Sequence, residues 1–214
     1  MAAMDHSPLR LDELRALKTL RKRIASANIP PSRLDETINI ATWNIRHWGA
    51  KRRRRCSLHY IAEIFHQFDL IVVTELRRDV RELKYVLELL GPYWQAVYSD
   101  YVEDAGGNKE RIAFVYDTRA VQSTGLAAES DGPREKDRTT GQYVPLFNWW
   151  RKPYLASFKA GTFDFVLLAV HLQWGTTAGR MAELEALADW VNGFQKDELR
   201  TDRDVIAIGD FNIT

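Results

Sequence analysis

Polar side chains able to bind metal or move protons follow directly after several apolar runs of this sequence. The last of these runs, Val205 to Ile208, is mostly β-branched and predicts a strand that is buried on both faces. Gly209 then lets the backbone turn, and Asp210 and Asn212 stand at the exit of the strand. A carboxylate and a carboxamide two residues apart on a rigid strand can together hold a metal-bound water and a phosphate oxygen.

Three other predicted strands deliver polar residues in the same way. They run over 37–44, 70–75 and 163–170, and they lead to Asn44, Glu75 and His171. Because strand ends gather at one edge of a sheet, these side chains can converge although they are far apart in the sequence. Such an oxygen-rich set favours a hard cation such as Mg²⁺ or Ca²⁺ over zinc.

A second kind of chemistry is indicated by Glu110, at the start of a predicted strand over 110–116. Its carboxylate is a candidate partner for His171, holding the imidazole as an acid or a base. Taken singly, each of these residues would equally suit a turn cap or a surface position. Their joint occurrence at strand ends is what predicts a site.

Hydrophobic periodicity predicts the elements that position these residues. Helices are expected over 58–68, 80–90 and 181–194, after a first helix that begins at Ser7-Pro8 and extends to Ile24. Further strands are expected over 93–98 and over 154–158, the latter pairing with 163–170 as a hairpin. Residues 106–108 predict a turn, and the polar segment 129–141 predicts an exposed, mobile loop.

Two parts of unequal size are expected. Residues 1–34 form an accessory helix and a linker that begins at Pro30-Pro31, and residues 35–214 form the main domain. The accessory helix is expected to pack on that domain, although its basic amphipathic pattern would also suit a membrane or a partner.

Composition excludes several classes of protein. The chain has 214 residues, 45% of them hydrophobic and 28% charged, which is typical of a globular domain. No apolar run approaches the roughly 20 residues that span a bilayer, and the N-terminus lacks the apolar core of a signal peptide. Cys56 is the sole cysteine, so no internal disulfide forms, and we predict a cytoplasmic protein without a membrane partner. Because the net charge is +1, affinity for nucleic acid must come from local clustering.

At these residues the sequence resembles the endonuclease/exonuclease/phosphatase superfamily, and within it the deoxyribonuclease-I-like enzymes. The resembling segments, in the family's order, are Thr42-Trp-Asn-Ile-Arg46, Val73-Thr-Glu75, Lys109-Glu-Arg111, Arg151-Lys-Pro153, Val170-His171 and Gly209-Asp-Phe-Asn212. The Gly-Asp-Phe-Asn and Lys-Glu-Arg matches are the specific ones. The resemblance implies a four-layer α/β sandwich, in which two mixed sheets pack face to face and helices cover the outside.

The resemblance also implies a role for each matching residue. Glu75 would bind the catalytic divalent ion, Mg²⁺ with Mn²⁺ and Ca²⁺ as alternatives, and Asn44 beside it would hold metal or phosphate. Asp210 and Asn212 would orient the nucleophile and stabilise charge on the phosphoryl oxygens.

Leaving-group departure would be assisted by His171, oriented by Glu110. Arg111 and Arg151 would fix the substrate or the loops of the active site.

The sequence departs from the family pattern in two places. Glu75 follows Thr74 where members often have Gln. Members also carry a further Asp and a Ser-Asp-His segment after Gly-Asp-Phe-Asn, and the His of that segment is the usual general base. The sequence up to Thr214 contains neither the Asp nor the segment. We therefore expect these 214 residues to be a fragment with an incomplete second sheet, which hydrolyses phosphodiesters poorly by itself.

The predicted function is metal-dependent hydrolysis of phosphodiester bonds in nucleic acid. A DNA endonuclease is the leading form of this prediction. The run from Lys51 to Arg55 is either a solvated loop or, through Arg52, Arg53 and Arg54, a clamp for the phosphate backbone. Trp149-Trp150, beside Arg151, would either stack on bases or serve in core packing or in shielding Arg151. The alternatives are a phosphatase or phospholipase of the same superfamily and a non-catalytic nucleic-acid-binding module.

Overall fold

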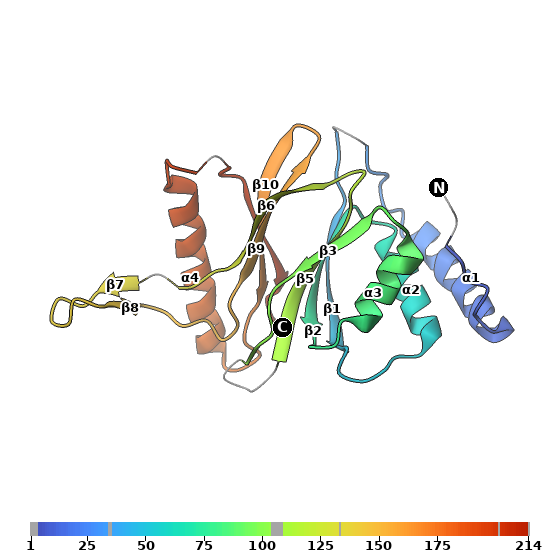
Figure 1. The fold of residues 1–214 in the computed structure, drawn as a ribbon, viewed down its shortest axis with the longest axis horizontal. Helices are drawn as coiled ribbons and strands as arrows, with labels where there is room; N and C mark the ends of the chain where they lie inside the picture. The colour runs from blue at the N-terminus through green and yellow to red at the C-terminus, as the bar shows by residue number, and fades with distance from the viewer. Residues whose placement is uncertain (1–3, 34–35, 104–108, 133, 201, 214) are drawn as a thin grey trace.

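Two β-sheets pack face to face in the computed structural model, which describes residues 4–33, 36–103, 109–132, 134–200 and 202–213 (Figure 1). The first sheet has the strand order β1-β2-β5-β3, with β4 beside β5. Its strands are β1 (Ile40–Trp48), β2 (Leu70–Leu76), β3 (Trp94–Tyr98), β4 (Val102–Glu103) and β5 (Lys109–Asp117). β1 is parallel to β2, whereas β2, β3 and β4 are antiparallel to β5.

The second sheet has the order β11-β10-β9-β6. Its strands are β6 (Gln122–Glu129), β9 (Tyr154–Ala160), β10 (Phe163–His171) and β11 (Val205–Asp210). β10 is parallel to β11 and antiparallel to β9, and β9 is antiparallel to β6. Both sheets are therefore mixed.

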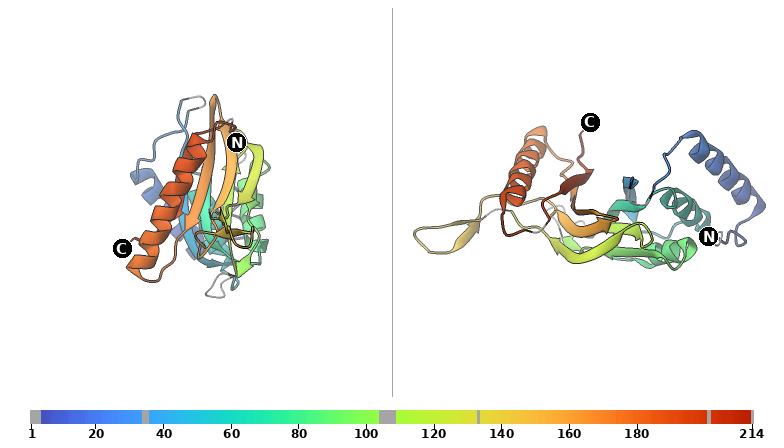
Figure 2. Two further views of the ribbon diagram at one scale, coloured as in Figure 1. Left: turned by 90° about the vertical axis from the view of Figure 1, so that its left-hand side faces the viewer. Right: turned by 90° about the horizontal axis from the view of Figure 1, so that it is seen from above.

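The core between the sheets is built from side chains that alternate along the strands, every second one facing the other sheet. Its largest fully buried members are Leu70, Phe114, Phe158, Phe165 and Leu167. On the outside, α2 (Arg55–Phe65) and α3 (Arg81–Leu90) cover the first sheet, and α4 (Thr177–Lys196) covers the second (Figure 2). The predicted four-layer α/β sandwich is confirmed.

An N-terminal helix, α1 (Leu11–Ser26), lies outside these layers and packs on α2 through Leu17 and Cys56. Polar contacts reinforce this packing, since Arg21 Nε and Nη2 donate to the Glu63 carboxylate at 2.8 and 2.6 Å. His6 Nε2 lies 2.8 Å from the same carboxylate. Among the described helices, none is both long and apolar enough to cross a membrane.

Two element boundaries differ from the prediction. The first helix begins at Leu11 rather than at Ser7-Pro8, because the cap is made by Arg10, whose backbone N–H donates to Glu13 Oε2 at 2.9 Å. β1 does not end at Asn44 but continues to Trp48, whose fully buried indole packs in the core beneath α2.

Two segments differ in kind. β6 was not predicted, because its Ser, Thr, Gly and Ala side chains are largely exposed and give no apolar alternation. The segment predicted as a loop over 129–141 contains β7 (Arg134–Lys136), which pairs with β8 (Tyr143–Pro145) in a hairpin that projects past α4 (Figure 1). The turn predicted over 106–108 lies outside the described residues.

The prediction that β11 is buried on both faces is wrong. Val205, Ile206 and Ile208 are half-buried and Ala207 is exposed. The reason is its position at the end of the second sheet, where it pairs with a single strand among the residues that the structure describes.

Candidate active site

Two pairs of parallel strands bring their ends to the same edge of the sandwich. In the first sheet, Asn44 is in register with Thr74, the residue before Glu75; in the second, His171 is in register with Asp210. β11 also lies against β1 and β2 of the other sheet. Asn44 Nδ2 therefore donates to Glu75 Oε1 at 2.9 Å and to Asp210 Oδ2 at 2.8 Å, joining the two sheets. The structure thus brings the predicted strand-end residues together.

Glu110, at the start of β5, is a second centre of this cluster. Its Oε2 lies 3.2 Å from His171 Nδ1 and 2.9 Å from Arg151 Nε, and its Oε1 lies 3.2 Å from Arg77 Nη2. Burial by itself raises the pKa of Glu110, but the hydrogen bond from His171 and the charges of Arg151 and Arg77 outweigh it and hold the pKa below its ordinary value. The ionised carboxylate fixes the His171 ring, whose Nε2 lies 4.0 Å from Asp210 Oδ2.

Two further members of the cluster, His47 and Arg77, were missed by the sequence analysis. The backbone N–H of His47 donates to Glu75 Oε2 at 2.9 Å, and its ring Nδ1 lies 3.2 Å from the same oxygen. Arg77 Nη2 lies 2.5 Å from that ring nitrogen, so Arg77 connects His47 with Glu110. His47 comes three positions after Asn44, and Arg77 comes two positions after Glu75. This closeness in sequence to predicted site residues is the one signal that could have identified them.

The backbone at this edge is strained. His47 and Glu75 have φ values of +52° and +61°, in the left-handed region that residues with a Cβ seldom adopt. Such conformations cost about 1–3 kcal/mol each and concentrate at functional sites. Here they turn the backbone N–H of His47 and the side chain of Glu75 toward each other.

Asp210 and Asn212 are held by the loop that follows β10. The backbone N–H of Asn212 donates to Asp210 Oδ1 at 3.0 Å, and its Nδ2 donates to the Leu172 carbonyl at 2.7 Å. Gly209, with φ +146°, passes so close to Val170 that a Cβ would lie 2.0 Å from the Val170 carbonyl oxygen. Glycine at this position therefore allows β11 to deliver Asp210 beside β10.

Arg111 is not brought to the cluster. It donates to the Ser99 carbonyl at 2.7 Å and lies over the rings of Tyr98 and Tyr101. As the neighbour of Glu110 on a strand, it faces the opposite side of the sheet. Arg111 thus fixes the turn after β3, and its described contacts include no residue of the cluster.

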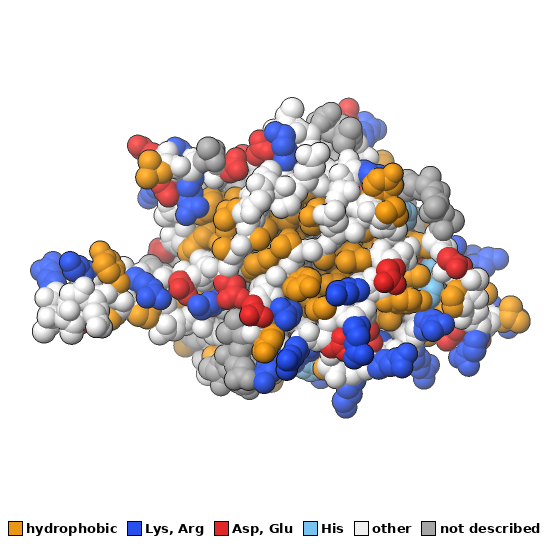
Figure 3. Space-filling model, in the orientation of Figure 1, with side chains coloured by type: hydrophobic (Ala, Val, Ile, Leu, Met, Phe, Trp, Pro, Cys, Tyr) orange, Lys and Arg blue, Asp and Glu red, His pale blue; other side chains and the backbone are white. Residues whose placement is uncertain are grey.

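The predicted phosphate-binding residues Arg52, Arg53 and Arg54 lie in the loop between β1 and α2. Arg53 donates through its backbone N–H to Glu82 Oε1 and through Nη2 to the Arg46 carbonyl, both at 2.6 Å. Arg52 and Arg54 are exposed and form no ion pair within the described ranges. Basic side chains gather on this part of the surface, at the lower right of Figure 3. The loop therefore lies beside the cluster rather than in it.

The two tryptophans predicted beside Arg151 have different environments. Trp149 packs with the core beneath α4, with its ring edge-on to Phe147 at 5.0 Å. Trp150 is 38% exposed, and its backbone N–H donates to Glu183 Oε1 at 2.9 Å. The packing interpretation is therefore the right one for Trp149.

Comparison with known proteins decides the family. A family model described as Endonuclease/Exonuclease/phosphatase family matches residues 41–214. The chain belongs to this family. The match covers every residue of the cluster from Asn44 to Asn212, and members of the endonuclease/exonuclease/phosphatase family are hydrolases of phosphodiesters or phosphate esters. No curated protein matches the sequence.

Solved structures of low sequence identity share the fold. A conserved protein of unknown function from Enterococcus faecalis is 19% identical, with a TM-score of 0.57 over 82% of this chain and 67% of that one. The catalytic domain of human nocturnin with a bound sulfate anion is 13% identical, with a TM-score of 0.56 over 82% and 65%. ANGEL2, a 2′,3′-cyclic phosphatase in complex with adenosine-2′,3′-vanadate, is 14% identical, with a TM-score of 0.54 over 82% and 53%. This chain therefore spans between about half and two thirds of the length of these proteins.

Enzymes of the endonuclease/exonuclease/phosphatase family typically use divalent metals, and the cluster fits one. Asn44 Oδ1 is buried and has no hydrogen-bond partner among the residues described, while Nδ2 of the same amide donates to the Glu75 carboxylate. An unpartnered buried oxygen on a side chain that contacts a carboxylate suits a hard cation. Ligand atoms of His47, Glu75 and Glu110 also lie within 4.8 Å of one another. Because Glu110 is already paired with two arginines, Glu75 and Asn44, with Asp210 beside them, fit the ion best.

Proposed function

We propose that this protein hydrolyses phosphodiester bonds of nucleic acid, with DNA as the first candidate, in a reaction that depends on Mg²⁺. The observation that carries the proposal is the joining of two arrays at one edge of the sandwich. Asn44, Glu75 and Asp210 form an oxygen-rich array that fits a hard cation. The Glu110–His171 pair, 4.0 Å from Asp210, forms an array that moves a proton.

Glu75 and Asn44 are the residues that would hold the metal ion, which when bound neutralises charge on the phosphoryl oxygens. Asp210 is fixed on both of its oxygens, by Asn44 Nδ2 at 2.8 Å and by the backbone N–H of Asn212 at 3.0 Å. A carboxylate fixed in this way is oriented to accept a proton from an attacking water.

His171 serves the leaving group. Its Nδ1 faces Glu110 and is assigned the hydrogen of that contact, so Nε2 is the nitrogen directed toward Asp210. A protonated Nε2 donates to the oxygen that leaves as the P–O bond breaks. Arg151 supports this geometry, because it pairs with Glu110 and its Nη1 lies 3.5 Å from the carbonyl of Leu172, the residue after His171.

The test compares three substrates with Mg²⁺ and with EDTA: supercoiled plasmid DNA, single-stranded RNA and p-nitrophenyl phosphate. We expect nicking of the plasmid that is slow and requires Mg²⁺. Glu75→Gln and His171→Asn should each reduce the rate by about 10²–10⁴-fold, the contribution of a positioned catalytic group. Asp164→Asn is the matched control, because it removes a carboxylate from an exposed pair with Lys159.

Metal binding is measured separately by calorimetric titration with Mn²⁺, which does not depend on turnover. Glu75→Gln should weaken it and His171→Asn should not; unchanged affinity in Glu75→Gln would remove Glu75 from the metal site. Phosphate release from the monoester without nicking would assign the protein to the phosphatases. DNA binding without hydrolysis of any substrate would assign it to the non-catalytic binding modules.

A further inference from the structure

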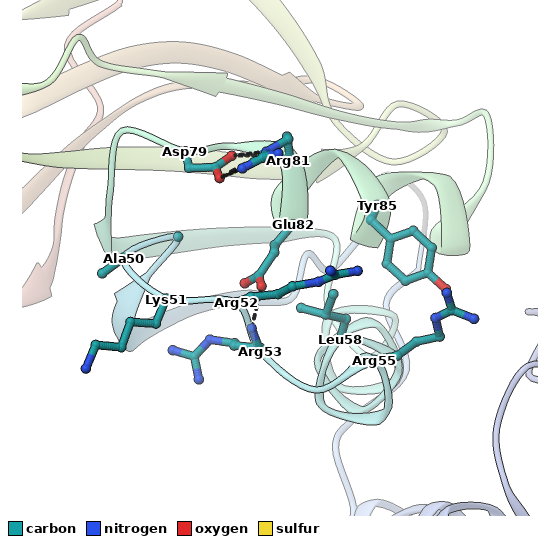
Figure 4. A pocket seen from close by; sticks show the side chains of 11 residues that line it. Ala50, Lys51, Arg52, Arg53, Arg55, Leu58, Asp79, Arg81, Glu82 and Tyr85 are labelled. Atoms are coloured by element: carbon teal, nitrogen blue, oxygen red, sulfur yellow. Dashed lines mark hydrogen bonds and ion pairs between the residues drawn. The ribbon is translucent and has the colours of Figure 1, made fainter.

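A cavity of 570 Å³ lies beside the candidate active site, between the loop after β1 and the start of α3 (Figure 4). Five cationic and two acidic side chains contribute to its lining. The cations are Lys51, Arg52, Arg53, Arg55 and Arg81. Because the whole chain has a net charge of +1, this is a local concentration of positive charge.

The cations differ in whether they are already paired. Arg81 pairs with Asp79 at 2.5 Å and lowers the pKa of that carboxyl to about 2, so the pair stays ionised and neutral overall. Arg53 is held by hydrogen bonds and not by an ion pair, since its backbone N–H donates to Glu82 Oε1 and its Nη2 to the Arg46 carbonyl, both at 2.6 Å. The remaining three form no ion pair in the described part of the chain: Lys51, Arg52 and Arg55.

The walls of the cavity distinguish it from a solvated loop. Leu58 is buried and lies against the cavity, as does the ring of Tyr85. The Tyr85 hydroxyl is held by His59 Nε2 at 3.1 Å, which fixes the ring. α2 begins at Arg55, and the positive end of its helix dipole adds to the potential there. Unpaired cations above an apolar wall suit a ligand with an anionic group and an uncharged body.

Two short segments at the ends of β1 and β2 connect the cavity with the active-site cluster. Gly49 and Asp79 line the cavity, whereas His47 and Arg77, two residues earlier on each segment, belong to the cluster. The segments are joined, since the Arg77 backbone N–H donates to the Trp48 carbonyl at 2.6 Å. Two residues span less than about 8 Å at 3.8 Å per residue, so the rim of the cavity lies close to the edge of the cluster that His47 and Arg77 form.

We propose that this cavity binds a backbone phosphate of the substrate strand, beside the bond that is cut, on Arg52 and Arg55. The inference rests on the proposed function but concerns binding alone. It predicts that strand length matters: a dinucleotide without terminal phosphates has a single phosphate, which the cluster binds, whereas a hexanucleotide has further phosphates for the cavity. It also distinguishes neighbours in the basic run, because Arg52 and Arg55 line the cavity and Arg54 does not.

The experiment measures the affinity of fluorescein-labelled single-stranded DNA by anisotropy in EDTA, where metal-dependent hydrolysis does not occur. The variant is Arg52→Gln with Arg55→Gln, and the matched control is Arg54→Gln. For the hexanucleotide, the slope of log affinity against log salt should fall by about 0.7, because the single phosphate bound in the cavity is one lost contact with a single strand. If the proteins bind equally at 1 M salt, this difference in slope corresponds to about 5-fold weaker binding at 0.1 M. The dinucleotide should bind equally to all three proteins.

Folding is checked by thermal unfolding, and the double variant should melt no lower than the wild type because it removes mutually repelling charges. A loss per removed charge in Arg54→Gln as large as that in the double variant would overturn the inference in favour of diffuse attraction. So would an unchanged hexanucleotide affinity, or an equal loss for the dinucleotide. A protein that shows the expected length dependence but fails to nick plasmid would contradict the proposed hydrolysis and leave the cavity assignment standing.

Discussion

Replacing Glu110 by Gln removes the counter-ion of two buried arginines. The Glu110 side chain is 8% exposed, and those of Arg77 and Arg151 are each 15% exposed. Gln keeps an oxygen that one partner can use, but it leaves the two guanidinium groups near each other without a negative charge. Removing one member of a buried ion pair costs about 3–5 kcal/mol, and because Gln keeps an acceptor we expect the lower end, about 3 kcal/mol.

The sign of the pH dependence follows from the pKa of Glu110. That pKa lies below its ordinary value of 4.5 in the folded protein. The contribution of Glu110 to the free energy of unfolding is therefore complete above about pH 4.5 and is lost as the pH falls through the folded-state pKa. Urea titrations at pH 7 should show the full difference between wild type and Glu110→Gln, and titrations at successively lower pH should show it shrinking.

Asp164→Asn provides the control for this measurement. Asp164 pairs with Lys159 at the surface, where the loss of a pair changes the free energy of unfolding by less than about 1 kcal/mol. If Glu110→Gln is no more destabilising than Asp164→Asn, or if its effect is the same at every pH, then Glu110 does not neutralise the buried arginines. The role assigned to Glu110 in holding His171 would then have to be abandoned as well.

Three further predictions concern stability and reactivity. Gly209→Ala should lower the free energy of unfolding by at least about 1–3 kcal/mol, because a Cβ would lie 2.0 Å from the Val170 carbonyl oxygen; an unchanged melting temperature would contradict this. Cys56 should react slowly with a thiol reagent until urea unfolds the protein, because burial raises the pKa of its thiol; fast reaction of the native protein would show that α1 does not cover it. Thr176→Ala should destabilise by about 1 kcal/mol in urea titrations, because its side chain accepts the Gly179 N–H at the start of α4, and a smaller loss would mean that water replaces the cap.

The strands that carry the site were predictable because most of them are strongly apolar. In β2, the residues from Leu70 to Val73 are at most 1% exposed, so both faces demand apolar side chains and the run is continuous. β10 has the same character up to Val170. Each of these apolar runs ends at a polar residue, Glu75 or His171, and this change of residue type marks the edge of the sheet. The members of the cluster that lie at strand ends could therefore be predicted.

The remaining parts lack a signal of that kind. His47 lies within a stretch where the pairing of β1 with β2 is irregular, and it adopts a left-handed backbone conformation that residue type does not reveal. Arg77 looks like any surface arginine in the sequence, yet its side chain is 15% exposed and paired with Glu110. Arg111 matches a family motif but lies on the other face of its strand. A motif match identifies residue types, whereas the face of the sheet on which a side chain lies is decided by the register of its strand.

The contacts of Glu63 have a consequence for where this protein can be divided. The family match begins at residue 41. Glu63, which is 4% exposed, nevertheless pairs with Arg21 and contacts His6, and both of these residues precede the match. His6 Nδ1 in turn lies 2.8 Å from His59 Nδ1, the ring that holds the Tyr85 hydroxyl at the wall of the basic cavity. A truncated protein that keeps only the family-matched part would lose these contacts and expose a face of α2. The boundary drawn by sequence similarity therefore falls inside a connected set of side-chain contacts, which extends from the N-terminal segment to the wall of the basic cavity.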